Sequence, residues 1–145
     1  MNEHTIYLGG GCFWGLQGYI KKIEGVLSTE VGYANGPTEN PSYEDVCHNS
    51  GHVEALKVTY DADTLSLDHL IQYFLRAIDP FSVNKQGGDV GIQYRTGIYY
   101  TDTADKSIIE STLARAQAFE GKPFAIEVLP LENYYSADRK STRLN

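Results

Sequence analysis

The amino-acid sequence predicts an α+β fold of one domain, in which helices cover a sheet in two layers. Its 145 residues match the length of an ordinary domain. With 41% hydrophobic and 21% charged residues, the chain has a globular composition. Strand and helix patterns follow the order β-α-β-β-α-β, and a further helix and strand come after them. This order is typical of a split βαβ core, so we expect a ferredoxin-like two-layer α/β sandwich with an additional helix and strand.

The helices are predicted from apolar residues at helical spacing and from the residues that end each stretch. The first helix covers 12–24 and ends at Gly25. The second begins after Ser66, a good N-cap residue, carries a continuous apolar stripe and ends at Asp79-Pro80. The third helix covers 102–120. Strand patterns fill the remaining positions, at 5–8, 26–33, 52–60, 94–100 and 124–129, with loops at 38–51 and 81–93.

Charge and cysteine content exclude several classes of protein. The chain has 12 Lys and Arg against 19 Asp and Glu, a net charge of −7. Without a basic cluster it is a poor candidate for binding nucleic acid or an anionic membrane. No stretch predicts a membrane span or a signal peptide. Two cysteines, Cys12 and Cys47, are too few for a disulfide framework, so we expect a cytoplasmic protein. We also expect a monomer.

The last eight residues differ in composition from the rest. Positions 138–145 hold three basic groups and one acidic group, without apolar periodicity. They resemble translated adapter sequence, so we expect them to be a non-native tail outside the fold. We therefore expect one domain over residues 1–137.

The segment around Cys12 is the most informative for function. A strand runs into Gly9, Gly10 and Gly11, and Cys12 follows at the first turn of a predicted helix. Unpaired N–H groups and the helix dipole favour an anion there, and hence a reactive thiolate. A buried, inert cysteine is the alternative. A nucleotide-binding loop is excluded, because neither glycine-rich phosphate motif is present.

The residues around Cys12 also carry a resemblance to a known family. The sequence GCFWG at 11–15 resembles the signature of the type A peptide methionine sulfoxide reductases. Later blocks in the family order are also similar, and the resemblance covers roughly residues 5–137. These blocks are GYANG at 32–36, NPSYEDVC at 40–47, SGHVE at 50–54, DP at 79–80, NKQGGDVG at 84–91 and QYRT at 93–96.

The resemblance implies a reaction and a nucleophile. The family reduces the S epimer of methionine sulfoxide, free or in peptides and oxidised proteins, to methionine. By this resemblance, the Cys12 thiolate attacks the sulfoxide sulfur and becomes a sulfenic acid. No bound cofactor is implied; an external thiol reductant, thioredoxin or a similar protein, reduces Cys12 again.

Glu54 is the proton donor that the resemblance implies, and strand periodicity supports it independently. In the strand at 52–60, Glu54 shares a face with Leu56, Val58 and Tyr60. A carboxyl group on such an apolar face should hold its proton near neutral pH, as a general acid requires. The alternative is a carboxylate turned to solvent at the end of the strand.

The resemblance assigns roles to five further residues. Tyr43 and Tyr94 match the tyrosines that donate hydrogen bonds to the sulfoxide oxygen. Asp89 matches an aspartate of the same cavity. Phe13 and Trp14 match the pocket for the methyl group of the substrate. By residue type alone, the tyrosines and the Phe13–Trp14 pair could equally be packing residues, and Asp89 could be a turn residue.

Three alternatives to a working reductase stay open from the sequence. Cys47, His48 and His52 lie close together but fit no standard zinc spacing. A cysteine–histidine hydrolase would need a histidine beside Cys12 and an oxyanion hole. The family usually continues with a Tyr-His-Gln segment and often a resolving cysteine, which positions 138–145 lack. The chain is therefore either recycled by an outside thiol or is a truncated domain that only binds methionine-containing peptides, and the role of Cys47 is open.

Overall fold

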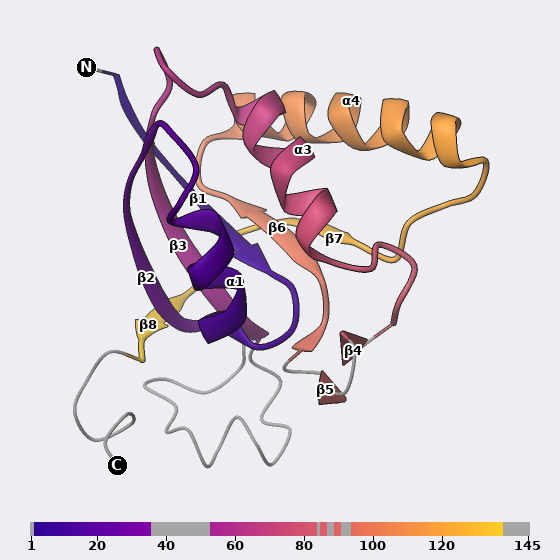
Figure 1. Cartoon of the computed structure of the whole chain (residues 1–145), viewed down its shortest axis with the longest axis horizontal. Coiled ribbons are helices and arrows are strands. Elements are labelled where there is room, and N and C mark those ends of the chain that lie inside the picture. The colour runs from indigo at the N-terminus through magenta and orange to yellow at the C-terminus, as the bar shows by residue number, and fades with distance from the viewer. Residues whose placement is uncertain (1, 36–52, 84, 87–88, 91–93, 138–145) are drawn as a thin grey trace.

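The structure is a computed structural model that describes residues 2–35, 53–83, 85–86, 89–90 and 94–137 (Figure 1). Its centre is a sheet of six strands in the order β7-β6-β1-β3-β2-β8. In chain order these strands are β1 Glu3–Gly9, β2 Val26–Ala34, β3 Val53–Asp61, β6 Gly97–Tyr100, β7 Glu127–Pro130 and β8 Tyr134–Ser136. Two short strands, β4 Lys85–Gln86 and β5 Asp89–Val90, form a separate hairpin. The expected mixture of helices and strands is confirmed.

The strand directions follow from three crossovers, which join the parallel pairs β1 and β2, β3 and β6, and β6 and β7. β1 lies antiparallel between β3 and β6, and β2 is antiparallel to β3. At one edge β7 runs parallel to β6, because the helix that joins them returns the chain to its starting end. At the other edge β8 is antiparallel to β2.

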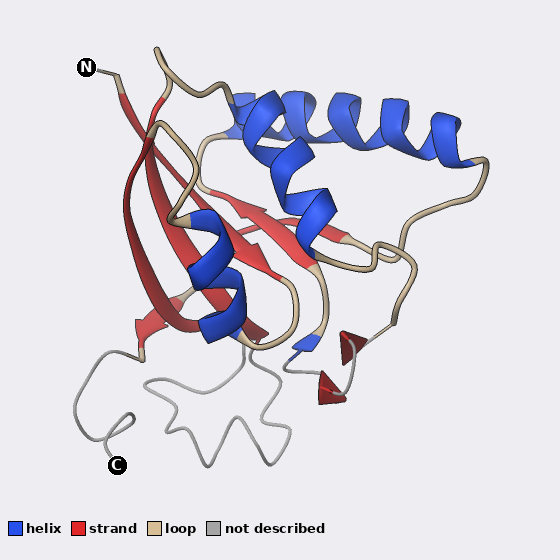
Figure 2. Ribbon diagram, in the orientation of Figure 1, coloured by secondary structure: helices blue, strands red, loops and turns tan. Residues whose placement is uncertain are grey.

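Three described helices lie against one face of the sheet: α1 Phe13–Ile20, α3 Leu67–Ala77 and α4 Thr103–Glu120 (Figure 2). The side chains of Ser66 and Asp102 cap α3 and α4 by accepting hydrogen bonds from the N–H groups of His69 and Ala104. Gly121, with φ of 80°, ends α4 in the left-handed conformation. The expected cap at Ser66 and the expected stop at Gly121 are thus confirmed.

Both faces of the sheet are covered. On the helix face, apolar side chains of the three helices pack on alternate strand residues; this core includes Leu8, Phe13, Leu56, Phe74 and Ile98. The opposite face carries a smaller cluster, including Tyr7, Val53 and Tyr99, against which Leu131 and Tyr134 of the C-terminal segment pack. No helix in the described part of the chain is long and apolar enough to cross a membrane.

The structure differs from the expected elements at several ends. α1 ends at Ile20 and not at 24, because the chain turns over 21–25 and Gly25 adopts a φ of 101°. The fourth main strand begins at Gly97 and not at 94, so Tyr94 precedes it. The β4–β5 hairpin and β8 were not expected from the sequence. Each is two or three residues long, too short to show an alternating pattern.

Candidate functional site

Cys12 lies at the N-cap of α1, directly after the glycine turn that ends β1. The thiol is partly exposed. Gly11 has a φ of 79°, and its N–H donates to the backbone oxygen of Tyr94 at 3.3 Å. A Cβ atom on Gly10 would lie 2.6 Å from the Ile78 side chain, and one on Gly11 would lie 2.7 Å from Gln86. The glycines are therefore needed for close approach and backbone shape, which together set the position of Cys12.

Glu54 reaches the start of the same helix from β3. Its carboxyl oxygen Oε1 accepts a hydrogen bond from the N–H of Phe13 at 3.2 Å. The side chain is 2% exposed, and Leu56, Val58 and Tyr60 lie in the core on the helix face. The predicted shared face is confirmed, and the alternative of a solvent-exposed Glu54 is wrong. A buried carboxyl group thus contacts Phe13, the residue that follows the candidate nucleophile.

Phe13 and Trp14 form an aromatic wall beside Cys12. Their rings meet edge to face, with centroids 5.0 Å apart. Phe13 also packs on Tyr33, with ring centroids 5.5 Å apart, and Tyr33 pairs with Glu54 across β2 and β3. Phe13 is 2% exposed and belongs to the core, whereas Trp14 is only partly buried. Of the two, Trp14 therefore offers the more accessible apolar surface.

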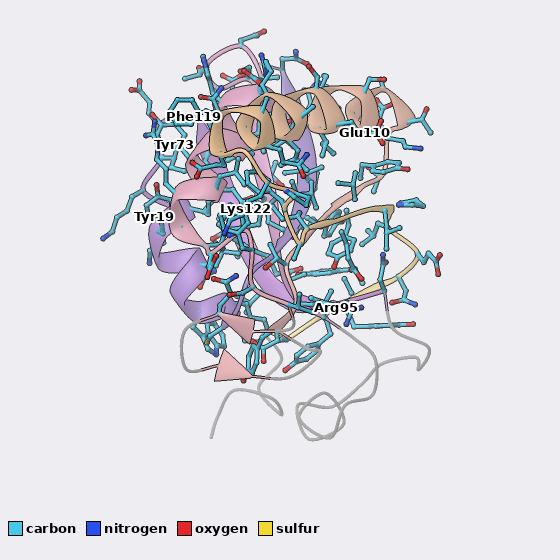
Figure 3. The ribbon with its side chains drawn as sticks, turned by 90° about the vertical axis from the view of Figure 1, so that its right-hand side faces the viewer. Tyr19, Tyr73, Arg95, Glu110, Phe119 and Lys122 are labelled. Carbon is cyan, nitrogen blue, oxygen red and sulfur yellow. The ribbon has the colours of Figure 1, made fainter. Side chains whose placement is uncertain are left out.

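Tyr94 lies next to the cysteine turn through its backbone, and neighbouring residues hold its segment in place. The Arg95 side chain (Figure 3) donates to the Glu127 carboxylate at 3.2 Å, and the Tyr99 hydroxyl donates to the same oxygen at 2.7 Å. Burial raises the pKa of Tyr99 well above its usual value, and the nearby Glu127 carboxylate adds to the rise. Tyr99 therefore remains a neutral donor, and it ties this segment to β7.

Several expected residues lie outside the described residues: Tyr43, Cys47, His48 and His52. The backbone of Asp89 belongs to β5, where it pairs with Gln86 of β4. Within the residues that the structure describes, no group of three or more metal-binding side chains is found. The site that can be described thus brings together Cys12, Phe13, Trp14, Glu54 and the backbone of Tyr94.

Gln86 is a neighbour of Cys12 that the sequence did not single out. Its side-chain amide accepts from the N–H of Asp79 at 2.7 Å and donates to the Asp79 backbone oxygen at 2.8 Å. It also donates to the Thr96 hydroxyl at 3.1 Å, and its Cβ lies against Gly11. One side chain therefore joins the end of α3, the Tyr94 segment and the cysteine turn. A glutamine within a polar loop gives no sequence signal for such a role.

A surface hollow of about 290 Å³ opens beside Cys12 between α1 and the end of α3. Its lining includes Gly11, Leu16, Tyr19, Arg76 and Gln86. Arg76 is the charged residue among the described residues that line it. Like Gln86, Arg76 gives no signal in the sequence, because charged residues are usual on the polar side of an amphipathic helix.

Comparisons with known proteins agree on one family. The family described as "Peptide methionine sulfoxide reductase" matches residues 4–142. "Peptide methionine sulfoxide reductase MsrA" of Lachnoclostridium phytofermentans is 55% identical over 139 residues, which are 95% of this chain and 83% of that protein. The reduced form of Mxr1 from Saccharomyces cerevisiae has a similar fold, with a TM-score of 0.90 and 32% identity over 97% of this chain and 82% of that chain. Mxr1 from Saccharomyces cerevisiae in complex with Trx2 has a TM-score of 0.71 and is 26% identical, over 94% of this chain and 82% of that chain.

Proposed function

Because this chain belongs to the peptide methionine sulfoxide reductase family, we propose that it reduces methionine S-sulfoxide, free or in polypeptides, to methionine through Cys12. Such a reaction repairs oxidised proteins. The observation that carries the site assignment is the hydrogen bond from the N–H of Phe13 to Glu54 Oε1, at 3.2 Å. It places a buried carboxyl group beside the residue that follows the thiol.

The reaction balances with two electrons taken from Cys12. The thiolate attacks the sulfoxide sulfur, a sulfur–sulfur bond forms, and the protonated oxygen of the substrate leaves as water. Water then attacks the Cys12 sulfur, the sulfur–sulfur bond breaks, methionine leaves with the electron pair, and Cys12 becomes a sulfenic acid. The start of α1 supports this step, because the N–H groups of a first helical turn stabilise negative charge on the sulfur.

Glu54 supplies the proton that the sulfoxide oxygen needs. Its burial on an apolar face favours the neutral carboxyl group. The N–H of Phe13 donates to Oε1, which favours a proton on Oε2. The carboxyl group is held by this bond, so the proton is delivered from a fixed position. We assign Tyr94 and Tyr43 as donors to the same oxygen, Asp89 to the same cavity, and Trp14 with Phe13 to the substrate methyl group.

An external dithiol completes the cycle. Its first thiol attacks the sulfenic acid and releases water, and its second thiol displaces Cys12 as a disulfide forms in the reductant. The yeast relative solved in complex with Trx2 supports a thioredoxin-like reductant. We propose that the protein is cytoplasmic, since thiol chemistry of this kind suits a reducing compartment. We also propose that it binds no cofactor and is a monomer.

We also propose that the core is ferredoxin-like and that residues 1–137 form one domain. The strands of the β-α-β-β-α-β portion lie in the order β6-β1-β3-β2, and every neighbouring pair among them is antiparallel. α4 and β7 are the additional helix and strand. This arrangement supports the description from the split βαβ pattern.

Steady-state reduction of the two sulfoxide epimers tests the proposed function. With dithiothreitol as the reductant, we expect turnover of a methionine-S-sulfoxide peptide and none of the R epimer. Cys12→Ser should abolish turnover, because an alcohol is far less nucleophilic than a thiolate at neutral pH. Unchanged activity in Cys12→Ser would contradict the assignment, and tight peptide binding without turnover in the native chain would favour a binding domain instead.

A further inference from the structure

A second hollow continues the surface beyond the one that contains Cys12. It has a volume of about 460 Å³ and is lined by residues that include Glu24, Thr64, His69, Tyr73 and Arg76. Arg76 lines both hollows, so it stands at the point where they meet. Tyr19 of α1 and Tyr73 of α3 lie on the same side of the molecule (Figure 3). We call the two hollows together the α1–α3 groove.

The α1–α3 groove is suited to a chain and not to a single amino acid. The hollow at Cys12 falls just below the roughly 300–1,000 Å³ that is usual for small-molecule sites. Because a second, larger hollow follows it, a polypeptide with its methionine sulfoxide at Cys12 has space for neighbouring residues on this side. The groove therefore starts beside Cys12 and leads away from it.

Arg76 is presented for an ionic partner. Its guanidinium carbon lies 5.4 Å from the centroid of the Tyr73 ring, over which the group is held. A guanidinium held on an aromatic face keeps its in-plane N–H donors for another group. None of the carboxylates in the described residues forms an ion pair with Arg76. Arginine binds carboxylates through two parallel hydrogen bonds, which makes it selective for them.

We propose that Arg76 forms a subsite for an acidic side chain that flanks the methionine sulfoxide in a polypeptide substrate. This inference rests on the proposed reaction at Cys12. The chain as a whole is acidic, with a net charge of −7, so its long-range field disfavours acidic substrates. Arg76 offers a local site of opposite charge at the reacting end of the groove. It selects among polypeptides by the residues beside the sulfoxide.

The test compares capped peptides that differ at one position. Each has a central methionine-S-sulfoxide, an acetylated N-terminus and an amidated C-terminus. Glu, Gln or Lys is placed one or two residues before or after the methionine sulfoxide. We expect kcat/KM for the Glu peptide to exceed that for the Gln peptide by about two- to fivefold at one of these positions, the range of an exposed ion pair. Arg76→Gln should bring the ratio to about one, and Arg76→Glu should favour the Lys peptide.

Lys106→Glu is the matched control. It changes the net charge as much as Arg76→Glu does, at an exposed position on α4. A ratio that survives in Lys106→Glu and disappears in Arg76→Gln supports the subsite. A ratio that is the same in wild type and Arg76→Gln, or one that Lys106→Glu removes equally, overturns it.

Two further measurements separate this inference from the proposed function. Affinities of the same peptides for Cys12→Ser, measured by calorimetry, report on Arg76 even if the native chain shows no turnover. Free methionine sulfoxide and its amide report on an α-carboxylate. If Arg76 discriminates only between these two, the subsite serves the free amino acid and the proposal for a flanking side chain is overturned.

Discussion

Glu54 is a buried carboxyl group with one contact that the proposed reaction uses. Packing alone does not explain a carboxyl group on an apolar strand face. Burying such a group costs free energy unless its polar atoms form hydrogen bonds. The N–H of Phe13 provides one such bond at the start of the helix that carries Cys12. The carboxyl group is therefore held at the start of the helix that follows Cys12, which is where the proposed reaction needs a proton.

Replacing Glu54 by Gln should slow methionine release by roughly 10²- to 10⁴-fold at neutral pH, the usual contribution of a positioned proton donor. Gln keeps the oxygen that accepts from Phe13 but cannot lose a proton to the sulfoxide oxygen. Single-turnover rates measure the effect. Glu110→Gln, on the exposed face of α4, is the control. A Glu54→Gln rate equal to that of the control would show that another group is the acid.

Asp68 is a residue whose ionisation stabilises the packing of two helices. On α3, its carboxylate accepts hydrogen bonds from Thr112 and Arg115 of α4. The Thr112 bond is the main cause that holds the pKa of Asp68 below its usual value, and the charge of Arg115 adds to it. Because the folded pKa is lowered, this stabilisation is present above pH 4 or so and is lost as the pH falls through the folded pKa.

Asp68→Asn should therefore lower Tm at pH 7, and the difference from wild type should shrink as the pH is lowered below about 4. Thermal unfolding at a series of pH values measures this. Asp63→Asn is a control with a carboxylate that no salt bridge holds among the described residues. A difference that stays constant down to pH 3 or so would contradict the role given to the charge.

The cysteine turn, the end of α3 and the segment before β6 are three elements that meet at Gln86. The Gln86 amide bonds to the Asp79 backbone after α3 and to the Thr96 hydroxyl before β6, and the Gln86 Cβ lies against Gly11 of the cysteine turn. The close contact of Gln86 with Gly11 passes this arrangement to Cys12. Small misplacements of reacting groups greatly lower a reaction rate. We therefore expect the contact between Gln86 and Gly11 to affect the rate of the proposed reaction at Cys12.

Gln86→Met keeps the length of the side chain but removes its three hydrogen bonds. We expect kcat to fall by roughly tenfold or more, because the turn that carries the Cys12 thiol is displaced. Gln117→Met is the matched variant, since it removes a glutamine bond to the N–H of Phe124 away from the site. If both variants lose stability alike and neither loses kcat, Gln86 has a structural role alone.

Across the whole molecule, the parts that the sequence predicted are those that depend on local patterns. Alternation along the predicted strand at 52–60 placed Glu54 on the apolar face, and Ser66 marked the start of α3. Gln86, Arg76 and β8 were missed because their roles arise from contacts between segments far apart in the chain. For example, Tyr134 of β8 lies against Tyr7 of β1, with ring centroids 5.0 Å apart. No local spacing contains that contact.

The C-terminal segment closes the second face of the sheet, so two truncations should differ. The Tyr134 hydroxyl donates to the backbone oxygen of Glu30, and Ala137 is buried with its N–H bonded to Val31. A chain that ends at Ala137 should keep its Tm, whereas one that ends at Leu131 should lose roughly 5–10 °C through the lost apolar burial. Equal Tm values for both truncated chains would contradict the role of β8.

The most direct measurement of the central claim is a single turnover with Cys47→Ser, in which Cys12 is the remaining cysteine. The protein is mixed with a methionine-S-sulfoxide peptide without reductant, and dimedone traps any sulfenic acid for mass spectrometry. We expect one methionine released per chain and a matching amount of dimedone on Cys12. Methionine release without modification of Cys12, or no release at all, would contradict it.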